Sequence, residues 1–302
     1  MNLRDLRYLV AVADQGHFGR AAAACFVSQP TLSMQVRKLE EELGVTLIER
    51  LTRGIRLTPV GEQIVQRARS VLLEVADMQR VALDARDPYA GELRLGVIPT
   101  VAPFLLPRVL PAIRRALPKL GIELAEAQTA VLLAGLEGGQ IDCAVLALPT
   151  GDPHLDECVL YDEPFLLALP RQHPLARRKS VDLADLDGMR VLLLEDGHCL
   201  RDQALAICSA AGAVENTNFR AASIETLRQM VRAGLGVTLM PALAARGDRS
   251  VAYVPFRDGG PRRVVGLAFR NSSARRLLMT SLAEVIGESM QSASSAASAS
   301  GA

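Results

Sequence analysis

One cysteine late in the chain has the surroundings that thiol redox chemistry requires. Cys199 follows His198, precedes Arg201, and stands after an apolar run at the start of a helical pattern. The first turn of a helix and a neighbouring positive charge both favour a thiolate, which is the form of cysteine that reacts with peroxide. Asp196 and Asp202 oppose this effect, so the sequence leaves its net sign open.

A second cysteine, Cys208, follows nine residues after Cys199. In one continuous helix this spacing separates two residues by about 13.5 Å along the axis, whereas a disulfide requires Cα atoms within about 7 Å. A bond between them would therefore remodel the segment: peroxide oxidises Cys199 to a sulfenic acid, and Cys208 captures it. The alternative is that both are buried cysteines acting as small hydrophobic residues. The spacing alone does not decide between the two.

The other cysteines and the histidines indicate no further chemistry. Cys25 and Cys143 lie in apolar segments that predict core positions, and Cys158 lies in a polar turn region. The four histidines show no metal-ligand spacing, so we expect no metal site. Walker, GxGxxG and GxSxG motifs are absent, and we expect neither a cofactor nor nucleotide or serine-hydrolase chemistry.

Length and composition bound the kind of protein. The chain has 302 residues, 49% of them hydrophobic, with 34 Lys and Arg against 33 Asp and Glu. This predicts about two domains and excludes a wholly disordered chain. No apolar run reaches the roughly 20 residues that cross a bilayer, and five scattered cysteines are unlike a secreted disulfide framework. The apolar stretch near the charged amino terminus is too short for a signal peptide, so we expect a cytoplasmic protein without membrane contact.

The first 58 residues predict three short helices and a hairpin. Helical spacing runs from Leu3 to Ala13, a small-residue segment follows over 18–25, and a third helix begins after Ser28 and ends at Gly44. Two short apolar runs then flank arginines. Residues 1–69 hold ten Lys and Arg against seven Asp and Glu. This arrangement is typical of a helix-turn-helix with a wing that binds DNA, although an ordinary structural subdomain would show the same spacing.

A long helix is predicted next, capped by Thr58 with Pro59 in its first turn. Its apolar residues step by four and three, as in a coiled-coil seam, and about 28 residues give a length of about 42 Å. We interpret it as a dimerisation helix over 59–87. The alternative is a helix packed on its own domain. The seam consists of Ile64, Ala68, Val71, Val75, Met78 and Ala82.

Beyond Pro88 and Gly91, strand-like runs alternate with helical patterns, which predicts an α/β domain with largely parallel sheets. About 200 residues allow two subdomains with a ligand cleft at the carboxyl ends of the strands. The last segment, 291–302, is almost wholly Ser, Ala and Gly and predicts a disordered tail. The strand-like runs are 93–98, 122–124, 143–148, 165–169, 191–194, 237–240 and 264–269.

Nearly the whole chain resembles the LysR-type transcriptional regulators, and its second half resembles their peroxide-sensing branch. The residues that carry the family resemblance are 21–23 (AAA), 28–33 (SQPTLS), 39–44 (LEEELG), 49–50 (ER) and 57–61 (LTPVG). Those that carry the peroxide-sensing resemblance are 195–203 (EDGHCLRDQ), Cys208, 219–221 (FRA) and 225–228 (ETLR).

The resemblance implies four segments: an all-α winged helix-turn-helix over 1–58, a linker helix over 59–87, a regulatory domain over 88–290, and the tail. The regulatory domain would be an α/β pair of periplasmic-binding-protein-like subdomains. The resemblance also implies a homotetramer on double-stranded promoter DNA that contacts RNA polymerase. Oxidised by hydrogen peroxide, it would activate oxidative-stress genes, and a thiol reductant such as a glutaredoxin or thioredoxin would reset it.

The resemblance also assigns residues, position by position. Cys199 becomes the peroxidatic cysteine and Cys208 the resolving one. A peroxide pocket would be lined by Thr100, Thr129, His198 and Arg270, although Thr100 could equally cap a helix. DNA contacts would come from Gln29, Pro30, Thr31, Ser33, Arg50, Arg53 and Arg56.

Two other functions compete with this interpretation. A LysR-type regulator gated by a small organic anion would not need both cysteines. A thiol peroxidase would consume peroxide continuously in the presence of a reductant, whereas a sensor reacts once. We therefore expect a regulator and not an enzyme.

Overall fold

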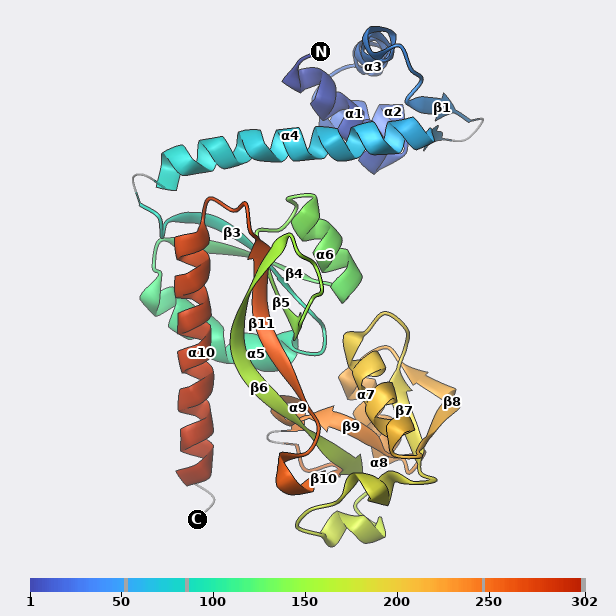
Figure 1. Cartoon of the computed structure of the whole chain (residues 1–302), viewed down its shortest axis with the longest axis vertical. Helices are drawn as coiled ribbons and strands as arrows, with labels where there is room; N and C mark the ends of the chain where they lie inside the picture. Colours follow the sequence, from blue (N-terminus) through green and yellow to red (C-terminus); the bar gives the residue numbers. More distant parts are fainter. Residues whose placement is uncertain (52–53, 85–86, 246–247, 300–302) are drawn as a thin grey trace. The chain divides into compact units, whose positions relative to one another are not determined.

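The computed structural model describes residues 1–51, 54–84, 87–245 and 248–299 and divides the chain into two compact units, Met1–Ala85 and Arg86–Ala302 (Figure 1). Arg53, one of the expected DNA contacts, lies outside the described residues. No helix in these ranges is both long and apolar enough to cross a membrane.

The amino-terminal unit has the three helices and the hairpin that the sequence predicts. The Ser28 hydroxyl caps the third helix by accepting the Thr31 N–H (3.3 Å), and left-handed Gly44 ends it (φ 70°). Leu9, Leu32 and Leu39 are fully buried where the helices meet. The elements are α1 (Leu3–Gln15), α2 (Phe18–Ala24), α3 (Gln29–Leu43), β1 (Ile48–Arg50), β2 (Ile55–Leu57) and α4 (Pro59–Asp84).

Helix α4 begins where the sequence predicts, with the Gly61 N–H donating to Thr58 Oγ1 (2.9 Å). Val65 and Ala68, in its first half, are buried within this unit. Further along, Val71 and Met78 are 43% and 71% exposed, so the second half of α4 leaves part of its apolar seam open to another surface.

The second unit has two lobes, each with its own hydrophobic core. The first lobe contains β3 (Gly91–Val97), α5 (Ala102–Ala116), β4 (Leu120–Glu126), α6 (Thr129–Glu137), β5 (Cys143–Leu148) and α10 (Arg276–Ala299). The second contains β7 (Arg190–Leu194), α7 (Cys199–Ala210), β8 (Val214–Ala221), α8 (Ile224–Arg232), β9 (Thr238–Pro241), α9 (Ala242–Ala245) and β10 (Ala252–Pro255).

Two strands, β6 (Leu155–Leu169) and β11 (Arg262–Arg270), connect the lobes (Figure 1). The first half of β6 pairs with β11, and its second half pairs with β9 and β10. The prediction of largely parallel sheets is wrong here. The chain leaves the first lobe on β6 and returns on β11, so β11 runs antiparallel to both β5 and β6. The pairs β3–β4, β3–β5 and β7–β8 are parallel, as predicted.

The carboxyl-terminal segment also differs from its prediction. Helix α10 packs along α5 and β6 and continues to Ala299, whereas the sequence predicts a disordered tail from residue 291. Alanine has the highest helix propensity, and no glycine or proline interrupts the segment before Gly301.

Candidate functional site

Cys199 is the first residue of α7, and His198 precedes it as the N-cap. Its side chain is half-buried, and its sulfur is a free thiol. A helix N-terminus favours negative charge because its first N–H groups have no partner within the helix. The fold thus places Cys199 at the end of a helix whose first N–H groups have no partner within the helix.

Arg201 does not offer Cys199 the free positive charge that the sequence suggests. Its guanidinium, 7% exposed, donates to both carboxylate oxygens of Glu215 (2.8 and 3.3 Å) and to Asp196 (2.8 Å). It also donates to the Leu194 carbonyl (3.2 Å). Two carboxylates therefore balance its charge, and the side chain ties the start of α7 to β8.

Cys208 lies in the core of the second lobe, in the same unbroken helix as Cys199. Only 3% of it is exposed, and burial raises the pKa of the Cys208 thiol to about 11. The two cysteines are nine helical positions apart, about 13.5 Å along the axis. In this conformation they cannot form a disulfide, which agrees with the sequence prediction that a bridge needs the segment to change.

A small recess beside Cys199 collects most of the expected pocket residues. Thr100, Thr129, His198 and Cys199 all line it, from three segments far apart in the sequence. Thr100 and His198 are 3% and 5% exposed. The Thr129 hydroxyl is buried and, within the described part of the chain, has no hydrogen-bond partner. A buried hydroxyl without a hydrogen-bond partner lowers the stability of the fold, so this hydroxyl is suited to bind a small polar ligand.

Arg270 is not part of this recess. Its guanidinium donates to the carbonyls of Leu136 (2.7 Å) and Ile141 (3.4 Å), at the carboxyl end of α6 and the loop after it. The expectation for Arg270 is therefore not met. A second arginine of β11, Arg263, stands seven residues earlier on that strand, about 23 Å away at 3.3 Å per residue.

Arg263 is the arginine that contacts a residue of the recess, Thr100, and the sequence analysis missed it. It donates to the Thr100 hydroxyl (3.1 Å) and carbonyl (3.2 Å) and pairs with Glu163. The side chains of this ion pair are 1% and 3% exposed. Since Arg263 occupies an acceptor site of the Thr100 hydroxyl, that hydroxyl can direct its proton into the recess. The sequence signal that could have identified Arg263 is its position as a charged residue directly before a buried apolar strand segment. Thr100 itself does not cap α5, whose N-cap is Val101.

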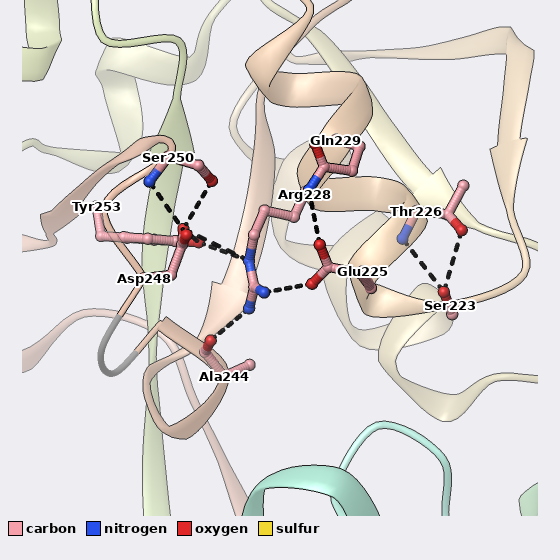
Figure 2. Close-up of polar contacts among 9 residues, drawn as sticks. All are labelled: Ser223, Glu225, Thr226, Arg228, Gln229, Ala244, Asp248, Ser250 and Tyr253. Carbon is pink, nitrogen blue, oxygen red and sulfur yellow. Dashed lines mark hydrogen bonds and ion pairs between the residues drawn. The ribbon is translucent and has the colours of Figure 1, made fainter.

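A wider cleft of about 460 Å3 between the lobes adjoins the recess. Its second-lobe wall is the start of α8, which a polar network around Arg228 holds in place (Figure 2). Arg228 contacts Glu225, donates to the Ala244 carbonyl (2.6 Å) and donates to the Tyr253 hydroxyl (2.9 Å). Tyr253 in turn donates to Asp248 (2.6 Å). This network makes the cleft wall a fixed surface.

The expected DNA contacts that the structure describes lie on α3 and the hairpin. Gln29, Pro30 and Thr31 are exposed at the amino end of α3. Arg50 donates to Ser33 Oγ (2.6 Å), and its guanidinium lies 4.8 Å from the centre of the Phe18 ring. This stacking orients Arg50 beside α3.

Arg56 differs from Arg50 because an acid already neutralises it. Two of its guanidinium nitrogens donate to the same carboxylate oxygen of Glu49 (3.0 and 2.6 Å). The pair is exposed, and such a surface pair is weak, so phosphate can compete for Arg56.

Two family descriptions match almost the entire chain. "Bacterial regulatory helix-turn-helix protein, lysR family" matches residues 3–62, and "LysR substrate binding domain" matches residues 86–291. The first range lies within the first compact unit of the structure, and the second range lies within the second unit. The chain belongs to the LysR family of bacterial transcriptional regulators.

The similar proteins within that family are peroxide regulators by name. "DNA-binding transcriptional dual regulator OxyR" of Escherichia coli (strain K12) is 50% identical over 289 residues, 95% of each chain. Among solved structures, a full-length OxyR variant from Pseudomonas aeruginosa matches with a TM-score of 0.78 and 37% identity, covering 95% of this chain and 98% of that one. An H2O2-bound OxyR variant from Corynebacterium glutamicum matches with a TM-score of 0.68 and 36% identity, covering 99% and 96%.

Proposed function

We propose that this chain is a cytoplasmic transcriptional regulator that senses hydrogen peroxide through Cys199 and Cys208. The observation that carries the proposal is the recess, where Thr100, Thr129 and His198 surround a thiol at a helix N-terminus. The similarity to proteins named hydrogen peroxide-inducible genes activators supports the same function.

The first chemical step takes place in the recess. The Cys199 thiolate attacks one oxygen of hydrogen peroxide, the O–O bond breaks, and the departing hydroxide takes up a proton to become water. Cys199 is left as a sulfenic acid. The Thr100 and Thr129 hydroxyls hold the peroxide, and His198, together with Arg263 acting through Thr100, stabilises the departing oxygen.

The second step resolves the sulfenic acid. The Cys208 sulfur attacks the Cys199 sulfur, a disulfide forms, and a second water leaves, so that two electrons in all have passed from the sulfurs to the peroxide. With its pKa raised to about 11, buried Cys208 is a neutral thiol at pH 7 and is shielded from peroxide. It reacts only after α7 unwinds and releases it from the core. This order makes oxidation and the change of structure one event.

The segment that changes is α7, which leads into β8, and the change would pass to the oligomer. We propose that the exposed apolar seam of α4 pairs with a second copy and that two such dimers form a homotetramer on promoter DNA. Gln29, Pro30, Thr31, Ser33, Arg50, Arg53 and Arg56 would contact the DNA. The oxidised form would recruit RNA polymerase, and a dithiol reductant of the glutaredoxin or thioredoxin kind would restore the thiols.

Peptide mapping with and without one equivalent of peroxide tests the chemistry. We expect a Cys199–Cys208 cross-linked peptide in the wild type and a trapped Cys199 sulfenic acid in Cys208→Ser. A transcriptional response to peroxide that survives Cys199→Ser would eliminate the proposal in favour of another effector, such as a small organic anion. Continued peroxide consumption with a reductant would instead indicate a thiol peroxidase.

Salt dependence tests the DNA face. Arg50→Ala should reduce the slope of log affinity against log salt by about 0.9, the value for one lost phosphate contact. Arg177→Ala, which removes an exposed charge from the second lobe, is the matched control and should leave the slope unchanged. Equal slopes for both variants would remove Arg50 from the interface.

A further inference from the structure

The recess beside Cys199 is too narrow for a water molecule in the described conformation. Its free volume for a water molecule is about 0 Å3, although it is lined by groups suited to hold a peroxide. A site needs at least about 10–15 Å3 to admit even one water. Hydrogen peroxide is larger than water, so a wall of the recess must move before a peroxide can lie between Thr100, Thr129 and Cys199.

The wall that separates the recess from the wider cleft includes Gln128. Pro99, Gln128 and His198 line both spaces, and the cleft on the outer side holds about 460 Å3. Pro99 has a rigid ring, and His198 is 5% exposed in the segment that leads into α7. Gln128 is half-buried and has a long side chain with freely rotating bonds. Of the three, it is the side chain that can move without moving the backbone.

The contacts of Gln128 place it across the opening. It occupies the N-cap position of α6, yet its side chain does not cap that helix. Instead, its amide reaches from the first lobe to the second, where Nε2 makes a long hydrogen bond of 3.5 Å to the Asp196 carbonyl. A Cβ atom added to Gly197 would lie 2.4 Å from Gln128 Oε1, so the amide packs directly on the Gly197 backbone. Only a residue without a side chain at 197 leaves room for it.

We propose that Gln128 is a gate that determines which peroxides reach Cys199. In the closed position its amide covers the recess from the cleft side. When it swings into the cleft, hydrogen peroxide passes, whereas an alkyl hydroperoxide with a bulky carbon substituent is held out. The inference rests on the proposed function of Cys199. The reaction behind the gate is the same for both oxidants: the thiolate becomes a sulfenic acid, the O–O bond breaks, and water or the corresponding alcohol leaves.

The gate is held weakly, and this sets the size of the expected effect. A hydrogen bond of 3.5 Å lies at the limit of useful geometry, so losing it should speed entry of hydrogen peroxide by no more than about two- to fivefold. Removing the bulk of the side chain should act mainly on the larger oxidant. The selectivity between oxidants is therefore a sharper readout than the rate with either one.

The experiment measures second-order rates of Cys199 sulfenic acid formation in the full-length Cys208→Ser protein, with hydrogen peroxide and with tert-butyl hydroperoxide. In Gln128→Ala the ratio of the two rates should shift toward tert-butyl hydroperoxide by about tenfold, since the opening is widened while the reacting groups are kept. Gln128→Met retains the length and bulk of the side chain and should keep the wild-type ratio. Gln140→Ala, an exposed glutamine of the same lobe, is the matched control.

Each outcome decides the question. An unchanged ratio in Gln128→Ala, with normal hydrogen peroxide reactivity, would overturn the gate while leaving the proposed function intact. A ratio that changes as much in Gln128→Met as in Gln128→Ala would also overturn it, because the barrier would then not be steric. If Cys199 does not react with hydrogen peroxide even in the Gln140→Ala background, the proposed function itself is wrong.

Discussion

Replacing an alanine on the exposed face of α7 with glycine tests whether oxidation unwinds that helix. Ala206 lies between the two cysteines, is exposed, and makes no core contact, so Ala206→Gly weakens the helix without opening a cavity. Glycine costs about 1 kcal/mol relative to alanine in a helix interior. If α7 is helical only in the dithiol form, this cost falls on that form alone and favours the disulfide.

The expected effect is a shift in reduction potential. For a two-electron couple, about 1.4 kcal/mol corresponds to about 30 mV, so the potential of the Cys199–Cys208 couple should fall by about 20 mV. Titration in dithiol–disulfide buffers, with acid trapping and mass analysis of the α7 peptide, measures this value. Ala134→Gly makes the same change on the exposed face of α6 and should leave the potential unchanged. A potential for Ala206→Gly equal to that of the wild type, or a higher one, would refute the unwinding of α7.

Two further predictions concern stability. Phe26 is 96% exposed and has a left-handed backbone (φ 55°), which asparagine adopts at lower cost. Phe26→Asn should therefore stabilise the amino-terminal unit by about 1 kcal/mol, measured as slower amide exchange in α2 and α3. Unchanged exchange would show that the backbone of Phe26 is not strained. At Asp248, burial disfavours the carboxylate, but hydrogen bonds from Tyr253 and Ser250 and the charge of Arg228 outweigh it, so the pKa of Asp248 lies below its ordinary 3.8. Its ionised form then stabilises the second lobe above that pH. Near neutral pH, the wild type should be more stable than Asp248→Asn by about 2 kcal/mol in denaturant unfolding, and this difference should disappear as the pH falls below 3.8. A difference that does not change with pH would show that the Asp248 carboxylate does not stabilise the lobe.

The sequence predicts those parts of the fold whose signals are local. The helices over 3–15 and 29–43 have an apolar period of 3.6 and end at left-handed glycines, so both their existence and their ends are readable. The strand Cys143–Leu148 is a continuous apolar run, as a strand buried on both faces must be. By contrast, β8 contains Glu215, Asn216 and Arg220 and shows no strand pattern, because its pairing with β7 and not its own composition makes it a strand.

The residues of the candidate site likewise fall into those with a local sequence pattern and those without one. Cys199 and His198 can be recognised in the sequence because a cysteine at the start of a helix has a local pattern, and the nine-residue spacing to Cys208 adds a geometric constraint. Arg263 is not readable, since it stands 163 positions from the Thr100 hydroxyl that it contacts. Choosing Arg270 in its place rested on a local match, and only the folded structure shows that Arg263, and not Arg270, contacts Thr100.

The assembly of the recess from distant segments has a consequence for the newly made protein. While the chain leaves the ribosome, Cys199 emerges before Arg263, and the ion pair that positions Thr100 forms only after β11 has been synthesised. Until then the proposed peroxide site around Cys199 is incomplete. On the proposed function, sensitivity to peroxide is therefore acquired only by the finished molecule.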